Sequence, residues 1–271
     1  MTERIMNARM YAVTPAIEDA WRDLLEYVTQ AAGVTFDYVR YPAPQPLEEL
    51  WSRADLGCVF MCGYAFALKL ARVVPIAAPI PRASWAAGRP IYRSDLIVGA
   101  GSPYRTLADT FGGRAGWTVK HSHSGFNALR HHLLPYRTRE RPKLYAEVTG
   151  NLVTARAILD GVREGRIDIG PLDAYWHMLV THHAPELTAG IRVLDSTEPA
   201  PIPAFVASAD VPRDVVERLR AAFVDARKEI WFAPIAEQLL IDGFAGVTAA
   251  DFAPLLAWDR EAKAAGYPLP A

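Results

Sequence analysis

Residues 117–134, WTVKHSHSGFNALRHHLL, combine the pattern of a short strand, a polar turn and the pattern of a helix. The strand pattern covers residues 115–119, and beyond the turn the apolar side chains recur at helical spacing. Ser122 or His123 stands at the expected N-cap of the helix. A strand that leads through a short turn into a helix is the repeating unit of α/β proteins, so this stretch predicts an α/β fold.

The turn itself suits a small oxyanion. The first N–H groups of a helix have no partner inside the helix, and the helix dipole adds partial positive charge there. Ser122 and Ser124 supply hydroxyl groups, and His123 is a donor that is neutral or cationic near neutral pH. We therefore expect Ser122, His123, Ser124 and Gly125 to bind a phosphate, phosphonate, sulfonate or carboxylate group. The alternative is that Ser122 only caps the helix and that the histidines are solvated.

Strand and helix patterns also alternate in the residues before this stretch. Thr14 is the expected N-cap of an amphipathic helix, Pro15 its first residue and Gly33 its end. The other expected elements are strands at 9–13, 35–41, 54–60 and 73–80, and helices at 47–52 and 63–70. This order predicts an α/β layer with a parallel sheet.

A second α/β layer is expected over about residues 95–195. Its strands fall at 92–99, 115–119, 144–148, 166–170 and 191–194, and its later helices at 152–162 and 174–180. The chain then returns to the first layer through a strand at 204–207 and helices at 212–229, 235–240 and 248–265. We predict two α/β lobes, 1–91 plus 200–271 and 92–199, joined by two hinge crossings, with a ligand cleft between the lobes.

Ligands of parallel sheets bind beyond the carboxyl ends of the strands. Tyr11 and Thr14 stand at the end of the first expected strand, and Tyr64 stands in the turn after the strand at 54–60. We expect these three residues to contact the ligand, although Tyr64 is equally suited to filling the wall of the cleft.

Composition and charge exclude several classes of protein. The chain has 271 residues, of which 22% are charged, and a formal net charge of −1, so no basic field favours nucleic acid or an anionic membrane surface. No apolar run is long enough to span a bilayer. Residues 1–13 show no secretory signal, so either that segment was removed or the protein stays in the cytoplasm.

Neither the cysteines nor the histidines indicate a metal or redox site. Cys58 and Cys62, four residues apart in an extended strand, are too distant to bridge, so we expect two small buried side chains. Three pairs raise the question of zinc, namely His121 with His123, His131 with His132, and His182 with His183. Adjacent helix residues point to different faces and no Cys or Glu falls at metal spacing beside them, so we expect solvated histidines, no metal and no cofactor.

In its order of segments the chain resembles the substrate-binding proteins of ABC importers with the type II periplasmic-binding-protein fold. The resemblance is greatest to the branch that binds phosphonate, phosphite and phosphate. Residues 122–125 stand where that branch carries S-T-S-G, its cradle for phosphonate oxygens. Further similar segments are 92–98, 106–113, 149–151 and 166–170.

The resemblance implies a solute-binding protein that captures a small oxyanion for ABC-type import. It implies the transporter's membrane subunits as partners and a periplasmic location, without binding to nucleic acid or insertion into the membrane. It places Asn151 in the family's G-S-H turn and Asp173 near the acidic group that contacts the amine of an aminophosphonate; Asp173 is equally suited to capping its own helix. The chain departs from the family at His123, where the family has Thr, and at Leu152, where it has His.

Two alternatives remain at this point. The same fold hosts enzymes of menaquinone and thiamine-precursor pathways, and such an enzyme would need an acid/base pair, for example Asp173 with His123. The other alternative is a cytosolic domain that senses a ligand and passes the signal to a partner.

Overall fold

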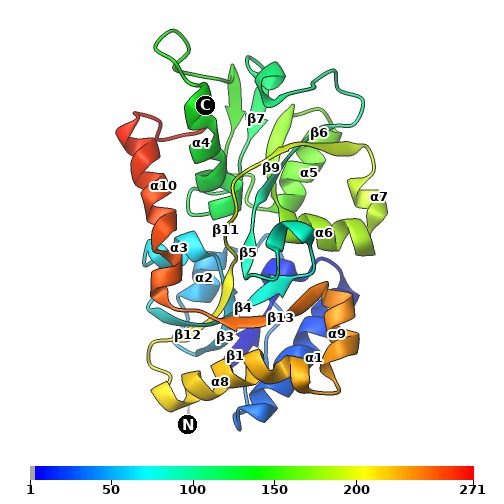
Figure 1. Cartoon of the computed structure of the whole chain (residues 1–271), viewed down its shortest axis with the longest axis vertical. Coiled ribbons are helices and arrows are strands. Elements are labelled where there is room, and N and C mark those ends of the chain that lie inside the picture. The colour runs from blue at the N-terminus through cyan, green and yellow to red at the C-terminus, as the bar shows by residue number, and fades with distance from the viewer. Residues whose placement is uncertain (1–3) are drawn as a thin grey trace. The chain divides into compact units, whose positions relative to one another are not determined.

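The computed structural model describes residues 4–271, and the chain divides into two units (Figure 1). Unit 1 contains the chain up to Tyr92 together with Pro201–Ala253, and unit 2 contains Arg93–Ala200 together with Pro254–Ala271. The first two changes of unit fall within the crossings expected from the sequence. The third was not expected: residues 254–271, which the sequence placed in the first lobe, pack in unit 2. Residues 1–3, part of the stretch in which a secretory signal was sought, lie outside the described residues.

Unit 1 is built on a six-stranded mixed sheet with the order β13-β4-β12-β3-β1-β2. Its strands are β1 (Ile5–Asn7), β2 (Asp37–Tyr38), β3 (Leu56–Met61), β4 (Val73–Pro81), β12 (Ala204–Ser208) and β13 (Ile241–Gly246). Strand β1 pairs in parallel with β2 and β3, whereas β12 runs antiparallel to β3 and β4 and β13 antiparallel to β4. The four strands from which a parallel sheet was predicted, β1 to β4, do point the same way, since β3 and β4 both run antiparallel to β12. The sheet is mixed because the later strands β12 and β13 run in the opposite direction.

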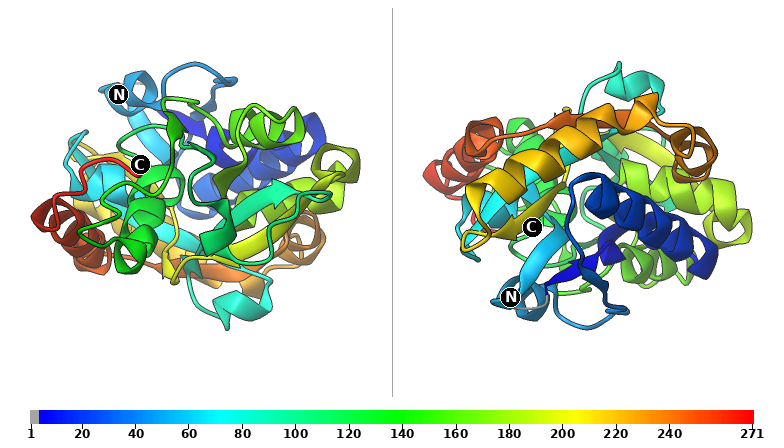
Figure 2. Two further views of the ribbon diagram at one scale, coloured as in Figure 1. Left: turned by 90° about the horizontal axis from the view of Figure 1, so that it is seen from above. Right: turned by 90° about the horizontal axis from the view of Figure 1, so that it is seen from below.

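The helices of unit 1 are α1 (Pro15–Ala31), α2 (Leu47–Trp51), α3 (Gly63–Ala67), α8 (Arg213–Asp225) and α9 (Phe232–Leu239). Helix α1 packs beside α8 and α9, and the blue α1 and yellow-orange α8 lie next to each other in the right-hand view of Figure 2. The apolar stripe of α1 is buried, with Trp21 fully covered and its ring edge-on to Phe60 at 5.1 Å between centroids. Phe60 in turn stacks on Phe205 at 3.8 Å, so the core of unit 1 is largely aromatic.

The first strand lies earlier than the sequence predicted. Residues 9–13 were expected to be extended, but Arg9–Tyr11 is a 3₁₀ turn and the strand is Ile5–Asn7. The buried Asn7 side chain explains the difference, because its Oδ1 accepts from the Arg9 N–H at 2.8 Å while its Nδ2 donates to the Val39 carbonyl at 2.6 Å. An Asn that bonds to the backbone two residues later closes a turn and ends the strand.

Unit 2 is built on a five-stranded mixed sheet with the order β10-β6-β9-β7-β8. Its strands are β6 (Ser94–Gly99), β7 (Arg114–Gly116), β8 (Glu147–Thr149), β9 (Ile169–Asp173) and β10 (Ile191–Ser196). Strands β7, β8 and β9 are parallel, and β6 runs antiparallel to β9 and β10. The carboxyl ends of β7, β8, β9 and β10 therefore meet the start of β6 at one edge of the sheet, and we call this edge the carboxyl edge of unit 2.

The helices of unit 2 are α4 (Ala128–Leu133), α5 (Ala155–Arg163), α6 (Ala174–His183), α7 (Pro185–Thr188) and α10 (Ala253–Ala264). The two chain segments that connect the units pair with each other as β5 (Ile91–Tyr92) and β11 (Ala200–Pro201). Short 3₁₀ turns lie at Ser84–Ala86, Leu107–Thr110, Leu134–Tyr136, Ala226–Lys228 and Ala249–Phe252, and a π-helical turn at His123–Asn127. Two α/β lobes are thus present, as predicted.

Both cysteines are buried and, within residues 4–271, neither forms a disulfide, as expected from their spacing. The prediction that the histidines are solvated was wrong for several of them. His132 bonds to Asp195 at 2.9 Å and His131 bonds to Glu261 at 2.8 Å, while His123 is 1% exposed. Among residues 4–271, no helix has both the length and the apolar character that a membrane span requires.

Candidate ligand-binding site

Three helical segments begin at the carboxyl edge of unit 2. The segment starting at His123 follows β7, α5 follows β8 and α6 follows β9. Each start is capped by a side chain: Ser122 accepts from the Gly125 N–H at 3.0 Å, Thr154 from Ala157 at 3.1 Å and Asp173 from Tyr175 at 2.9 Å. Three helix N-termini at one sheet edge give a region of partial positive charge with many backbone donors.

Residues 122–125, which we call the 122–125 turn, open the first of these helices with a π-helical turn. The Asn127 N–H donates to the Ser122 carbonyl at 3.1 Å, five residues back, instead of to a carbonyl four residues back. The Thr118 N–H, just beyond β7, donates to the Gly125 carbonyl at 3.1 Å. Of the two residues expected at the N-cap, Ser122 and His123, the structure has Ser122 there. Helical spacing alone did not indicate the π-helical geometry. Turns of this kind occur often at functional sites.

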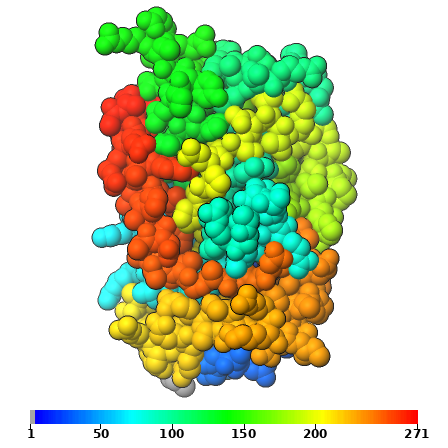
Figure 3. Space-filling model, in the orientation of Figure 1, coloured from blue at the N-terminus to red at the C-terminus, as the bar shows by residue number. Residues whose placement is uncertain are grey.

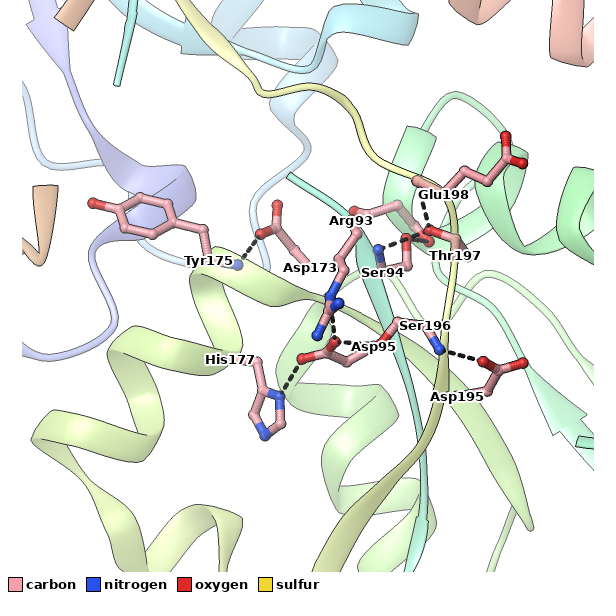
Figure 4. A network of polar contacts seen from close by, with 11 residues as sticks. Arg93, Ser94, Asp95, Asp173, Tyr175, His177, Asp195, Ser196, Thr197 and Glu198 are labelled. Carbon is pink, nitrogen blue, oxygen red and sulfur yellow. Dashed lines mark hydrogen bonds and ion pairs between the residues drawn. The ribbon is translucent and has the colours of Figure 1, made fainter. Parts of the chain in front are cut away.

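The turn is fastened to the start of β6 through Ser94, a residue that the sequence analysis did not select. The Ser94 hydroxyl donates to the Ser124 carbonyl at 2.9 Å, and the Ser94 N–H donates to the Thr197 hydroxyl at 2.9 Å. In the β6–β9 register Ser94 lies opposite Asp173 (Figure 4). Ser124, Ser94 and Asp173 therefore lie together at the carboxyl edge. The available signal was the polar pair Ser94-Asp95 at the start of a strand whose other residues are apolar or glycine.

A second polar group occupies the same edge around Asp95, which is 7% exposed. Its carboxylate bonds to His177 Nδ1 at 2.9 Å and to the Ser196 hydroxyl at 3.0 Å, and it faces Arg93 Nε at 3.4 Å. Figure 4 shows these side chains directed toward one another. The buried Asp95 carboxylate is thus bonded and paired within its own group of side chains.

The side chain of His123 is buried inside unit 2. Its Nδ1 lies 3.3 Å from Asn127 Nδ2, and its ring packs against Trp258 at 5.1 Å between centroids. Burial, with a smaller contribution from the nearby His131, lowers the pKa of His123 to about 3. Of the two states considered for His123, neutral and cationic, burial favours the neutral imidazole at pH 7.

Gly125 has no room for a side chain. A Cβ at this position would lie 2.0 Å from the Thr118 hydroxyl oxygen and 2.8 Å from its methyl carbon. The Thr118 hydroxyl is itself buried, and among the described residues it has no hydrogen-bond partner. Trp117 Nε1, on the neighbouring residue, is in the same situation. Two buried donors without acceptors thus lie beside the turn, and such groups usually have a water or ligand partner.

The loop before α5 is exposed and strained. Asn151 and Val153 both have positive φ, of 56° and 63°, and a β-branched residue rarely adopts this conformation. Between them, Leu152 packs against the apolar core of unit 2, which includes Ile158. Leu152 stands where the resembling family has a His, so an apolar contact replaces a hydrogen-bond donor here. Asn151 lies at the carboxyl edge, and its contact with a ligand stays a prediction.

Asp173 caps α6, one of the two roles considered for it. Its Oδ1 accepts from the backbone N–H groups of Tyr175 at 2.9 Å and Trp176 at 3.1 Å. Asp173 and His123 were named as one example of the acid/base pair that an enzyme would need. In the structure Asp173 is engaged with the helix start, and His123 is buried against Trp258. Contact between Asp173 and a ligand amine stays a prediction.

The three candidates of unit 1 lie beyond the carboxyl ends of β1 and β3. Tyr11 is 1% exposed with its ring edge-on to Phe60 at 5.1 Å, and Tyr64, in the first turn of α3, is 3% exposed. Thr14 caps α1 by accepting from the Ile17 N–H at 3.3 Å. The two tyrosine rings contribute to the core of unit 1, and ligand contacts by these three residues stay predictions.

The sequence matches the family model described as the periplasmic substrate-binding protein of phosphonate ABC transporters, over residues 12–252. The chain belongs to this family. It is therefore a substrate-binding protein of the phosphonate class for ABC import, as its order of segments predicted. The match ends before α10, so the part of unit 2 formed by residues 254–271 lies beyond the matched region.

Solved structures similar to this chain agree with the fold of the family. A binding protein of an ABC phosphonate transporter from Pseudomonas aeruginosa has a TM-score of 0.79 at 14% identity, covering 97% of this chain and 88% of that one. PhnD1 from Prochlorococcus marinus in complex with methylphosphonate has a TM-score of 0.77 at 14% identity, covering 96% and 98%. XAC2383 from Xanthomonas citri bound to ATP has 0.67 at 15%, covering 97% and 99%. No curated protein sequence matches the chain.

Proposed function

We propose that the 122–125 turn of this phosphonate-class protein binds the oxyanion head of its ligand, a phosphonate or the chemically similar phosphite or phosphate. The observation that carries the proposal is the meeting of three capped helix starts at the carboxyl edge of unit 2. Backbone N–H groups at helix starts favour tetrahedral oxyanions. Methylphosphonate in the related PhnD1 structure supports the same class of ligand.

Three features of the turn support an oxyanion as ligand. Ser122 uses its oxygen to accept from Gly125 N–H, which leaves its hydroxyl hydrogen available to an anion. Gly125 brings its backbone close to Thr118, whose buried hydroxyl has no acceptor among the described residues. Because a buried donor without an acceptor costs about 1–3 kcal/mol, an oxyanion that accepts from it would recover that free energy.

The groups that attract the anion carry no net charge; they are helix dipoles and hydrogen-bond donors. His123 does not supply a cation, because its pKa is lowered to about 3. Helix dipoles, N–H groups and hydroxyls remain, and they act without a change of protonation near neutral pH. Asp173 at the same edge favours a ligand that carries an amine beside its phosphonate group, since a second anionic group there would be repelled.

The proposal is tested by calorimetric titration of the wild-type protein with methylphosphonate, 2-aminoethylphosphonate, phosphite, phosphate and an alkyl sulfonate. We expect the double variant S122A/S124A to bind the preferred anion at least about tenfold more weakly, because it lacks two hydroxyl donors to a charged acceptor.

Thr106→Ala is a matched control, since Thr106 also caps a helical turn of unit 2 but lies in the connection between the end of β6 and the start of β7, at the other edge of the sheet. Its affinity should equal that of the wild type. Equal affinity of the serine double variant would refute the site, and a wild-type protein that binds none of these anions would refute the proposed ligand class.

We further propose that the protein acts in the periplasm and delivers its ligand to the membrane subunits of an ABC importer. Membership of a family of periplasmic transporter components supports both statements. Ligand-stimulated ATP hydrolysis by the reconstituted importer, measured with and without this protein, tests the partnership. The interlobe cleft and its hinge closure stay predictions from the sequence.

A further inference from the structure

Helix α10 carries a buried polar network directly behind the 122–125 turn. In Figure 3 the red-orange segment that contains α10 lies against the green segment that contains α4. The side chains that join the two helices include Asn127, which is 0% exposed, Arg130 at 1% and Asp259 at 5%. Hydrogen bonds between such deeply buried polar groups depend on direction, so they specify one geometry more strictly than apolar packing does.

Asn127 is the residue that links the turn to α10. Its Nδ2 donates to the Leu255 carbonyl at 3.0 Å and lies 3.3 Å from His123 Nδ1, and its Oδ1 accepts from Arg130 Nη2 at 2.9 Å. The same residue closes the π-helical turn through its backbone N–H, which donates to the Ser122 carbonyl at 3.1 Å. Asn127 thus contacts both the 122–125 turn and α10.

Arg130 completes the network. Its guanidinium pairs with Asp259 at 2.5 Å, donates to the Pro268 carbonyl at 3.1 Å and lies over the Phe126 ring at 4.9 Å. The carboxylate of Asp259 also accepts from Lys263 at 2.7 Å. The guanidinium is therefore held on three sides and presents one fixed donor to Asn127 Oδ1.

A π-helical turn is less favourable than an α-helical one, and it persists only where surrounding contacts hold it. Ser94 and Thr118 hold the turn from the sheet side, and Asn127 holds it from the side of α10. If the contacts of Asn127 were lost, the segment could return to regular α-helical bonding, and the backbone N–H groups of the 122–125 turn would point in different directions. A shift of about 1 Å in such groups is enough to impair a binding site.

We propose that Asn127 and Arg130 are positioning residues, through which α10 sets the geometry of the 122–125 turn for its anion. The inference rests on the proposed function, because it assigns the network to the same site. It also goes beyond the family match, since α10 lies outside the matched residues 12–252.

The test compares Asn127→Leu with the wild type and with Arg137→Ala. Leucine has a similar size but makes none of the three side-chain hydrogen bonds. Arg137 is the matched control, because it also ties the C-terminal segment to unit 2, through the Ala265 carbonyl at 2.8 Å and the Tyr267 ring at 4.2 Å, without contacting the turn. Two quantities are measured: affinity for methylphosphonate by calorimetry, well below each melting temperature, and hydrogen exchange of residues 119–129 without ligand.

We expect Asn127→Leu to bind methylphosphonate at least about tenfold more weakly, with unchanged stoichiometry. Its residues 119–129 should exchange faster, because the hydrogen bonds of the Asn127 side chain no longer fix the turn. Arg137→Ala should resemble the wild type in both measurements, whatever its melting temperature. Should Asn127→Leu not fold, Asn127→Ser, which removes the same contacts with less crowding, replaces it.

The inference is overturned if the Asn127 variant keeps both the wild-type affinity and the wild-type exchange rate, or if Arg137→Ala loses affinity to the same degree. A wild-type protein that binds no anion would overturn the proposed function instead. The exchange measurement needs no ligand, so it still decides in that case whether Asn127 fixes the turn.

Discussion

At the scale of single residues, neighbouring side chains of the Ser122-His123-Ser124 motif lie in different environments, part at the carboxyl edge and part in the interior. Ser122 and Ser124 are half-buried at the carboxyl edge, while His123, between them in sequence, is buried against Trp258. From the sequence, alternating Ser-His-Ser indicated three polar groups acting on one ligand. The helical turn that begins at His123 directs that side chain toward α10, a partner 135 residues away that no local pattern could identify.

Burial of a neutral histidine has a consequence for stability. The folded-state pKa of His123 is about 3, against about 6.5 when unfolded, so below pH 6.5 the unfolded chain binds a proton that the folded chain excludes. Acidification from pH 7 to pH 5 should therefore reduce the free energy of unfolding by about 2 kcal/mol through this group. Urea unfolding of the wild type and of His123→Gln at both pH values measures the effect.

The glutamine variant cannot take up a proton in this range, so its stability should change less between pH 7 and pH 5 than that of the wild type. The comparison removes the contributions of the other histidines, which both proteins share. Identical pH dependence in the two proteins would contradict the assignment of a neutral, buried His123.

At the scale of elements, several helices followed from residues next to them. Thr14, Pro15 and Gly33 marked α1 correctly, and Ser122 and Asp173 mark real helix starts. Strand β13, with two glycines and no clear alternation, was missed because its partner β4 lies far away in sequence. Ser94 was overlooked for the same reason, since its role depends on the register of β6 against β9.

The buried ion pair between α4 and α10 should be a strong determinant of stability. Asp259→Ala leaves Arg130 charged and unpaired in the interior, which we expect to cost about 3–5 kcal/mol in the free energy of unfolding. Lys263→Ala is the control, because Lys263 bonds to the same carboxylate but is 60% exposed, and its removal should cost less than about 1 kcal/mol. Denaturant unfolding of both variants provides the values, and equal costs would show that burial of the pair is unimportant.

At the scale of the whole molecule, the alternation of strands and helices was enough to predict two α/β lobes. Composition cannot show which lobe a terminal helix joins, and α10 was placed in the wrong one. Its apolar side chains suit either core, and the choice is made by specific partners, among them Asp259 for Arg130 and the Leu255 carbonyl for Asn127. Such pairings depend on three-dimensional neighbours that no spacing rule contains.

The assignment of residues 254–271 to unit 2 predicts a selective effect of truncation. A chain that ends at residue 252 loses the buried Leu255 and Tyr267, which should destabilise unit 2 by about 3–6 kcal/mol. It also loses Asp259, which should add about 3–5 kcal/mol. Hydrogen exchange should become faster in β7, β8 and α4, whereas β3, β4 and β12 of unit 1 should keep their protection. Lost protection in unit 1 with unit 2 intact would contradict this division.

The same division has a consequence for biosynthesis. A nascent chain leaves the ribosome amino end first, and its domains generally fold in that order. Every strand of both sheets is translated before residue 254, yet the carbonyl that Asn127 needs belongs to Leu255. If Asn127 positions the 122–125 turn as proposed, a newly made molecule should bind its anion only after residues 254–271 have been translated and have docked on unit 2.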